Sequence, residues 1–240
     1  RWCVGGTTNV VLNCIDKSQG TPTWNKEFLV WEGEDSKQQR RFTYGEFNVE
    51  VCKLAAALKS LGIGKGDVVA VFMPNLPETF AAFFAIQKIG AIMMPLFSGF
   101  GPQPIVTRLN DGGAKVVITA DGTWRRGAPG DMKTVLDEAL GEVPSVKQVI
   151  VVRHMGDKLN TPMRAGRDHW WGDLVAGQPD DVPTEEMDAE APAILLYTSG
   201  TTGKPKGCVW THVGFLGSMV TRDMHICCDF KSTDRFFFMS

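Results

Sequence analysis

Short apolar segments alternate with amphipathic ones from residue 41 to residue 152, and this alternation constrains the fold more than any other feature. The segment "DVVAVFM" (67–73) is typical of a buried strand, because it is short, apolar and rich in valine. Before it, Thr43 and Glu46 have the spacing of a capping box. Apolar residues then recur at helical spacing until Gly62, where we expect the helix to end.

The same alternation continues after residue 73. Strands that alternate with helices at this spacing are joined by right-handed crossovers. We therefore expect an α/β fold with a mainly parallel sheet and helices on both faces. The expected elements are a helix opened by Asn75 and Glu78 and ending near Gly90, a strand at 91–97, a helix at 102–110, a strand at 115–120, a helix at 131–140, and strands at 146–152 and 193–199.

Residues 153–191 are polar and rich in glycine, proline and acidic residues. We interpret them as a long excursion over the surface. Trp170 and Trp171 lie within it, and we expect them to pack on the core or over the sheet edge. Stacking on adenine is the less favoured alternative.

The formal net charge of −2 gives no electrostatic reason to expect nucleic acid or an anionic membrane as partner. The most apolar region, 80–97, contains Gln87, Lys88 and Pro95, and is too interrupted for a membrane span. The six cysteines form no CxxC pair, so a zinc site is not expected. Scattered cysteines favour a reducing compartment, and we expect a cytoplasmic protein.

The segment "YTSGTTGKPKG" (197–207) combines glycines, hydroxyl side chains and two lysines directly after an expected strand. Glycines let backbone N–H groups approach an anion, and lysines suit phosphate oxygens. Ligands of parallel sheets bind beyond the carboxyl ends of strands. A solvated surface loop has a similar composition and stays an alternative. A Walker A loop is excluded, because Pro205 follows Lys204 and Thr198 stands where its first glycine is required.

This segment resembles the phosphate-binding signature of the adenylate-forming superfamily, which contains acyl-CoA synthetases, luciferases and peptide-synthetase adenylation domains. From about Trp2 to the last residues, the chain resembles the first part of the large N-terminal domain of that superfamily. The segments "GGTTNVVLNCID", "RRFTYGEF", "LKSLGIGKGDVVAVFMPNLPE", "RLNDGGAKVVITAD" and "DHWWGDL" are similar to the acetyl- and propionyl-CoA synthetase branch.

The resemblance implies an AMP-forming acyl-CoA synthetase that uses ATP, Mg²⁺ and coenzyme A. A carboxylate, here a short-chain one such as acetate or propionate, would attack the α-phosphate of ATP, and coenzyme A would then take the acyl group. An adenylation domain that loads a carrier protein, or a nucleotide-binding module without turnover, stays an alternative. The residues implied to bind the ATP phosphates are Thr198, Ser199, Gly200, Thr201, Thr202, Gly203, Lys204 and Lys206.

For coenzyme A, the resemblance implies the turn Phe97, Ser98, Gly99 and Phe100, in which a serine replaces one glycine of the family. It also implies Arg125 after "ITAD". Many members have a second arginine three residues later, where this chain has Ala128, and Arg126 is the candidate substitute.

We expect residues 1–240 to be the N-terminal part of the AMP-binding domain, with residues 1–40 as an extension and the C-terminal lid domain absent. The catalytic lysine and the Mg²⁺ ligands would then lie downstream of Ser240, and "DRFFFMS" would be an unfinished strand. Such a segment is expected to be inactive alone and prone to self-association.

Three further expectations concern the segment 197–207 and the residues that follow it. We expect His212 to begin a helix and to pack on its own turn, and Cys208 to be a buried small hydrophobe. We expect the segment 197–207 to be poorly ordered without nucleotide.

Overall fold

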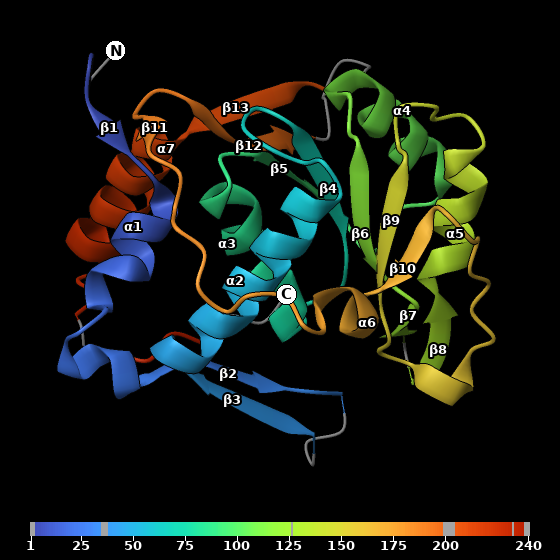
Figure 1. Ribbon diagram of the computed structural model, residues 1–240, viewed down its shortest axis with the longest axis horizontal. Coiled ribbons are helices and arrows are strands. Elements are labelled where there is room, and N and C mark those ends of the chain that lie inside the picture. The colour runs from blue at the N-terminus through green and yellow to red at the C-terminus, as the bar shows by residue number, and fades with distance from the viewer. Residues whose placement is uncertain (1–2, 35–37, 126, 199–204, 232, 238–240) are drawn as a thin grey trace.

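One large sheet runs through the molecule, as the computed structural model shows (Figure 1). The structure describes residues 3–34, 38–125, 127–198, 205–231 and 233–237. Within these ranges, seven strands lie in the order β10-β9-β6-β4-β5-β12-β13, and all neighbours are parallel except β12 and β13. The expected mainly parallel sheet is therefore confirmed. The strands are β4 (Val68–Phe72), β5 (Ile92–Leu96), β6 (Val116–Ala120), β9 (Gln148–Val152), β10 (Asp168–Trp170), β12 (Pro192–Tyr197) and β13 (Gly207–Thr211).

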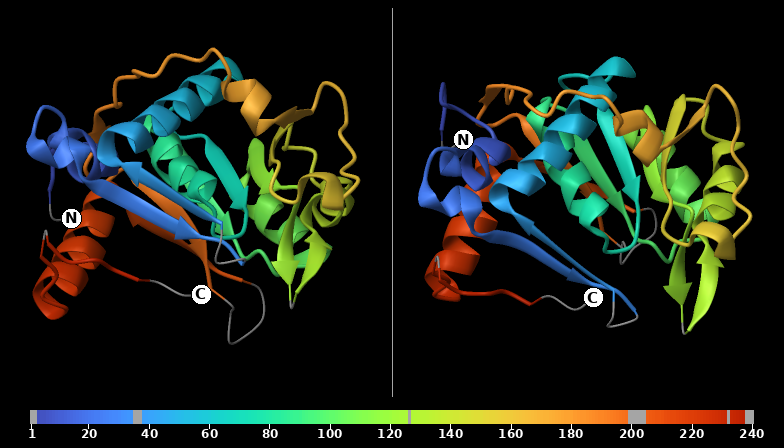
Figure 2. Two further views of the ribbon diagram at one scale, coloured as in Figure 1. Left: turned by 90° about the horizontal axis from the view of Figure 1, so that it is seen from below. Right: turned by 60° about the horizontal axis from the view of Figure 1, so that its bottom comes forward.

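Helices cover both faces of this sheet (Figure 2). The helix α3 (Pro77–Lys88) connects β4 to β5, whereas α4 (Pro102–Gly112) and α5 (Met132–Leu140) belong to connections that cross the sheet in the opposite direction. Because such crossovers are right-handed, α3 lies on one face and α4 and α5 lie on the other. The helices α2 (Tyr44–Ser60) and α1 (Val10–Cys14) pack against α3.

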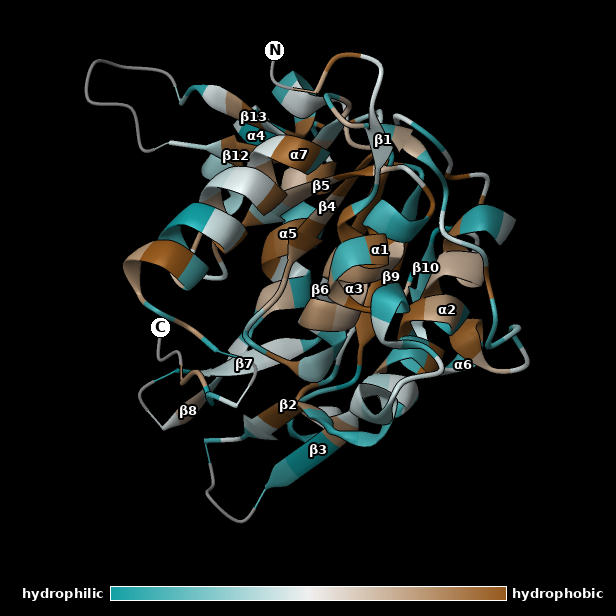
Figure 3. Cartoon of the chain, turned by 90° about the vertical axis from the view of Figure 1, so that its left-hand side faces the viewer, coloured by the Kyte–Doolittle hydropathy of each residue, from teal (hydrophilic) through white to brown (hydrophobic). Residues whose placement is uncertain are grey.

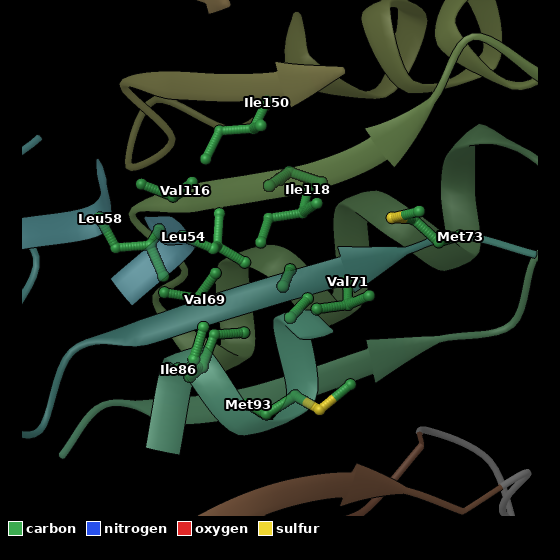
Figure 4. Close-up of a cluster of buried hydrophobic side chains, with 14 of the residues drawn as sticks. Leu54, Leu58, Val69, Val71, Met73, Ile86, Met93, Val116, Ile118 and Ile150 are labelled. Carbon is green, nitrogen blue, oxygen red and sulfur yellow. The ribbon is translucent and has the colours of Figure 1, made fainter. Parts of the chain in front are cut away.

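The central strands are buried on both faces, which explains their continuous apolar sequences. Side chains of α2 and α3 pack on one face of β4, β5 and β6, as Leu54, Ile86 and Val69 illustrate (Figure 4). Figure 3 shows the contrast with the strand β3 (Gln39–Thr43), which is mostly hydrophilic and begins with three exposed residues.

The starts of α2 and α3 can be compared with the helix starts that the sequence predicts. At α2 the capping box is confirmed, because Thr43 Oγ1 accepts from the backbone N–H of Glu46 at 3.2 Å and the Thr43 N–H donates to the Glu46 carboxylate at 2.8 Å. The expected start of α3 at Asn75 and Glu78 is wrong. Leu76 is the N-cap of α3, and Pro77 takes the first helical position, where its fixed φ suits the helix and its missing N–H costs nothing.

Residues 153–191 are more than a surface excursion. Asp168–Trp170 forms β10, which extends the main sheet beside β9, and β11 (Met187–Asp188) pairs with β1 (Thr7–Thr8). Trp171 begins α6 (Trp171–Val175) and is buried at 6% exposure, so its expected core packing is confirmed.

Two antiparallel hairpins were not expected: β2 (Glu27–Glu32) with β3, and β7 (Gly122–Arg125) with β8 (Ala128–Asp131). After β13 come α7 (His212–Gly214) and a π-helix at Phe215–Cys227. The expected strand near the end is wrong for its described part, because residues 234–237 form no strand. The remaining elements are 3-10 helices at Asp16–Ser18, Pro22–Asn25 and Gly156–Lys158. No helix in the described ranges is long and apolar enough to cross a bilayer.

Candidate functional site

The base of the glycine-rich segment is a short antiparallel ladder between β12 and β13. Tyr197 pairs with Gly207, and the backbone N–H of Thr198 donates to the carbonyl of Lys206 at 3.1 Å. The ladder brings Thr198 and Lys206 together at the carboxyl end of β12. The other implied phosphate-binding residues, which are Ser199, Gly200, Thr201, Thr202, Gly203 and Lys204, lie outside the described residues, and so does most of the segment that we expected to be poorly ordered.

Tyr197 anchors this base to helix α4. Its hydroxyl donates to the Asp111 carboxylate at 2.6 Å. Burial, together with this hydrogen bond and the Asp111 charge, raises the pKa of Tyr197 well above its usual range. A Cβ atom at Gly112 would lie 2.7 Å from the Met94 sulfur, and one at Gly207 would lie 3.0 Å from the Leu195 Cδ1 atom, so the two glycines leave room for the apolar side chains beside Tyr197. Tyr197 is therefore a neutral anchor.

The turn Phe97–Phe100 follows β5, next to β12 in the sheet. The backbone N–H of Phe100 donates to the carbonyl of Phe97 at 2.9 Å, and the two rings meet edge to face with centroids 5.6 Å apart. Phe97 is 67% exposed, so it offers an apolar surface to a ligand. The chain leaves β5 toward β6 and leaves β12 toward β13, in opposite directions. Such divergent connections open the crevices in which ligands of parallel sheets bind.

Arg125 stands at the tip of the β7–β8 hairpin, in register with Ala128. A Cβ atom at Gly99 would lie 2.5 Å from the Arg125 Nη2 atom, so the guanidinium lies against the backbone of the turn. Arg125 forms no ion pair with any described carboxylate, which leaves its charge available to an anion. Arg126 lies outside the described residues.

Asp121 holds the start of this hairpin and was missed as a site residue. Its buried carboxylate accepts from the backbone N–H groups of Gly122 at 2.7 Å, His154 at 2.9 Å, Met155 at 2.9 Å and Gly156 at 3.1 Å. These bonds join the ends of β6 and β9 to the start of β7. An aspartate directly after a buried strand was the available signal.

Two expectations next to the segment need correction. His212 begins α7 as expected and is fully buried, but it packs against α1, where its Nδ1 atom accepts from the Val10 N–H at 3.3 Å. Burial lowers the pKa of His212 to about 4. Cys208 is exposed, because β13 is an edge strand, so its expected burial is wrong.

Within the described ranges, no three side chains of histidine, cysteine, aspartate or glutamate lie together in a way that could hold a metal ion. The described cationic and hydroxyl groups instead suit anionic ligands such as phosphates.

Comparison with known proteins gives consistent results. The acetyl-coenzyme A synthetases of Chlorobaculum tepidum and Gemmatimonas aurantiaca are 42% and 46% identical to this chain, over 99% and 92% of its length. The aligned region is 35% and 34% of those proteins, so the chain spans about a third of their length. The solved structure of acetoacetyl-CoA synthetase from Streptomyces lividans superposes with a TM-score of 0.84 at 27% identity, over 96% of this chain and 34% of that one.

The family model described as AMP-binding enzyme matches residues 16–240. The match covers the main sheet, the base of the glycine-rich segment, the turn after β5 and the β7–β8 hairpin. This chain belongs to the AMP-binding enzyme family.

Proposed function

We propose that this chain is part of an AMP-forming acyl-CoA synthetase that activates a short-chain carboxylate such as acetate or propionate. The observation that carries the proposal is the contact between Arg125 and Gly99. It brings a free guanidinium to an exposed aromatic turn, one strand away from the base of the glycine-rich segment. The names and identities of the relatives support the same reaction.

In the first half-reaction, the segment from Thr198 to Lys206 would bind the β- and γ-phosphates of ATP. Backbone N–H groups and the lysine charges would orient pyrophosphate as the leaving group while a carboxylate attacks the α-phosphate. This chemistry depends mainly on positioning and on neutralising charge. Mg²⁺ would arrive with ATP and contribute to that neutralisation, and we assign it no ligand in this chain.

In the second half-reaction, Arg125 would pair with a phosphate of coenzyme A, and the turn from Phe97 to Gly99 would support the rest of the nucleotide. Charge-assisted hydrogen bonds from arginine suit phosphate oxygens. The absence of a side chain at Gly99 leaves room for Arg125 close to the backbone. We include Arg126 in this proposal on sequence grounds alone.

We further propose that residues 1–240 form the first part of an AMP-binding domain, with residues 1–40 as an extension of it. The aligned share of about a third of the relatives supports a part of a longer protein, and the family model begins at residue 16, within the proposed extension.

The test uses the full-length protein that contains this chain. Pyrophosphate exchange is measured with carboxylates from acetate to hexanoate, and thioester formation is then measured with coenzyme A and with a phosphopantetheinyl carrier protein. We expect exchange that depends on acetate or propionate, and transfer to free coenzyme A. Transfer to the carrier protein alone would favour a carrier-loading adenylation domain. No carboxylate-dependent exchange would contradict the proposed reaction.

A further inference from the structure

Arg108 of helix α4 is a buried cation whose compensation within the described residues is unusual. It is 6% exposed and forms no ion pair with any carboxylate in the described part of the chain. Its Nη1 atom donates to the carbonyl of Pro104 at 2.9 Å, and its Nε atom has no partner there. Burying a charge is costly unless neighbouring groups compensate. The compensation that the structure offers comes from two aromatic rings.

The guanidinium lies 4.4 Å from the ring centroid of Phe100 and 5.7 Å from that of Tyr197. Such cation–π contacts stabilise arginine most strongly where water is excluded. Phe100 closes the turn after β5, and Tyr197 ends β12. Arg108 therefore contacts both segments that flank the candidate site.

Asp111 strengthens this arrangement. It lies three residues after Arg108, on the same side of the helix, and accepts from the Tyr197 hydroxyl at 2.6 Å. One helix face thus holds Tyr197 by its hydroxyl through Asp111 and by its ring through Arg108. A shift of Phe100 would be transmitted to Tyr197 through a planar, rigid group.

We propose that Arg108 is a positioning residue that couples the coenzyme A turn to the base of the phosphate-binding segment. The inference rests on the proposed function for the identity of the two ligands. Arg108 acts through Phe100 and Tyr197, so it sets the affinity for ATP and for coenzyme A together. Loss of Arg108 should weaken both, whereas loss of a residue that contacts one ligand should weaken only that one.

The test compares Arg108→Met with Arg108→Lys in the full-length protein. Arg153→Met is the control for loss of a cation–π contact elsewhere, because Arg153, which is exposed, also lies 4.4 Å from an aromatic centroid, that of Trp170. We expect Arg108→Met to raise KM for ATP in pyrophosphate exchange and KM for coenzyme A in thioester formation, each by about three- to fivefold, the size that loss of a cation–π contact gives. Arg108→Lys should raise both by a smaller factor, since lysine keeps the charge but loses the planar stacking.

A merely structural role would lower kcat through loss of folded enzyme and leave both KM values unchanged. That result, or a rise in only one KM, would overturn the inference. If Arg108→Met does not fold, the two KM values of Arg108→Lys test the inference in the same way.

Amide hydrogen exchange of the protein without ligands separates this inference from the proposed function. Exchange at Tyr197 and Gly207 should be faster in Arg108→Lys and in Arg108→Met than in Arg153→Met. If the wild-type protein activates no carboxylate, the proposed function fails. Unchanged amide hydrogen exchange at Tyr197 and Gly207 would independently show that Arg108 does not hold the segment.

Discussion

Arg125 lies against Gly99, so closely that a Cβ atom at Gly99 would be 2.5 Å from the Arg125 Nη2 atom. The two residues belong to different connections of the sheet, since Gly99 lies between β5 and α4 and Arg125 ends β7. In the proposed function, their contact would make one anion-binding surface out of two segments. It also makes Gly99 a sensitive position, because any side chain there competes with the guanidinium.

We therefore expect Gly99→Ala to raise KM for coenzyme A several-fold. The added methyl would displace Arg125 and the exposed ring of Phe97, and both side chains can move, so binding is weakened without loss of the fold. Gly101→Ala is the control, because a Cβ atom at Gly101 meets nothing within 4 Å. Steady-state thioester assays on both variants check this. Equal KM values for the two variants would mean that the contact has no part in binding.

Ala128 offers a gain of function. It lies in register with Arg125 across the β7–β8 hairpin. Many members of the family that the sequence resembles have an arginine at this position. Ala128→Arg should lower KM for coenzyme A, and the gain should shrink as salt is added, because an exposed charge is screened. Ala128→Gln adds length without charge and is the control. A similar KM in both variants at low salt would argue against a phosphate near this tip.

The sequence predicted the elements that carry long or periodic signals. The strands β4, β5, β6 and β9 have continuous apolar runs, and α2 has a capping box. The strand β10 could not be predicted, because three residues that begin with Asp168 give no apolar run, and its pairing with β9 depends on tertiary contacts.

In the candidate site, too, some residues could be predicted from the sequence and others depend on tertiary contacts. Phe97, Gly99 and Arg125 were implied by motifs, whereas the contact between Gly99 and Arg125 depends on how two connections end at one sheet edge. Arg108 gave no signal, because an arginine on an amphipathic helix usually faces water. Its burial depends on aromatic rings supplied by segments that are distant in sequence.

His212 predicts a pH dependence of stability. Its pKa is lowered by burial to about 4, whereas an unfolded histidine titrates near 6.5. Below about pH 6.5 the unfolded state binds a proton that the folded state does not, so the free energy of unfolding falls as pH falls from about 6.5 to about 4, by on the order of 2–3 kcal/mol. His212→Asn should flatten this part of the profile, because asparagine does not titrate. Urea unfolding at several pH values measures it, and a profile as steep as that of wild type would exclude His212 as the cause.

Asp168 predicts a large loss of stability. It pairs with fully buried Lys133 at 2.8 Å and with Arg167 at 2.5 Å. Asp168→Asn would leave Lys133 with Asp137, 2.6 Å away, as its counter-charge, and we expect a loss of about 1.5–3 kcal/mol in the free energy of unfolding. Asp157→Asn, at an exposed position, should change it by less than about 0.5 kcal/mol. Denaturant unfolding of both variants makes the comparison, and equal effects would contradict this role of Asp168.

The stabilising contribution of the Asp168 carboxylate also depends on pH. Burial raises the pKa of Asp168, but the hydrogen bonds from Arg167, the Arg164 N–H and Lys133 outweigh it and lower the pKa to about 2. Its stabilising contribution is therefore complete above about pH 4 and is lost as pH falls from about 4 to about 2.

The most direct test of the proposed synthetase measures both half-reactions of the full-length protein in two variants, Arg125→Ala and Lys206→Ala. Arg125→Ala should raise KM for coenzyme A by a factor that corresponds to about 1.5–3 kcal/mol, as for a charge-assisted hydrogen bond, and should leave pyrophosphate exchange nearly unchanged. Lys206→Ala should slow pyrophosphate exchange. If Arg125→Ala slowed exchange while KM for coenzyme A stayed at the wild-type value, or if Lys206→Ala exchanged pyrophosphate as fast as wild type, the proposed division of the site would be contradicted.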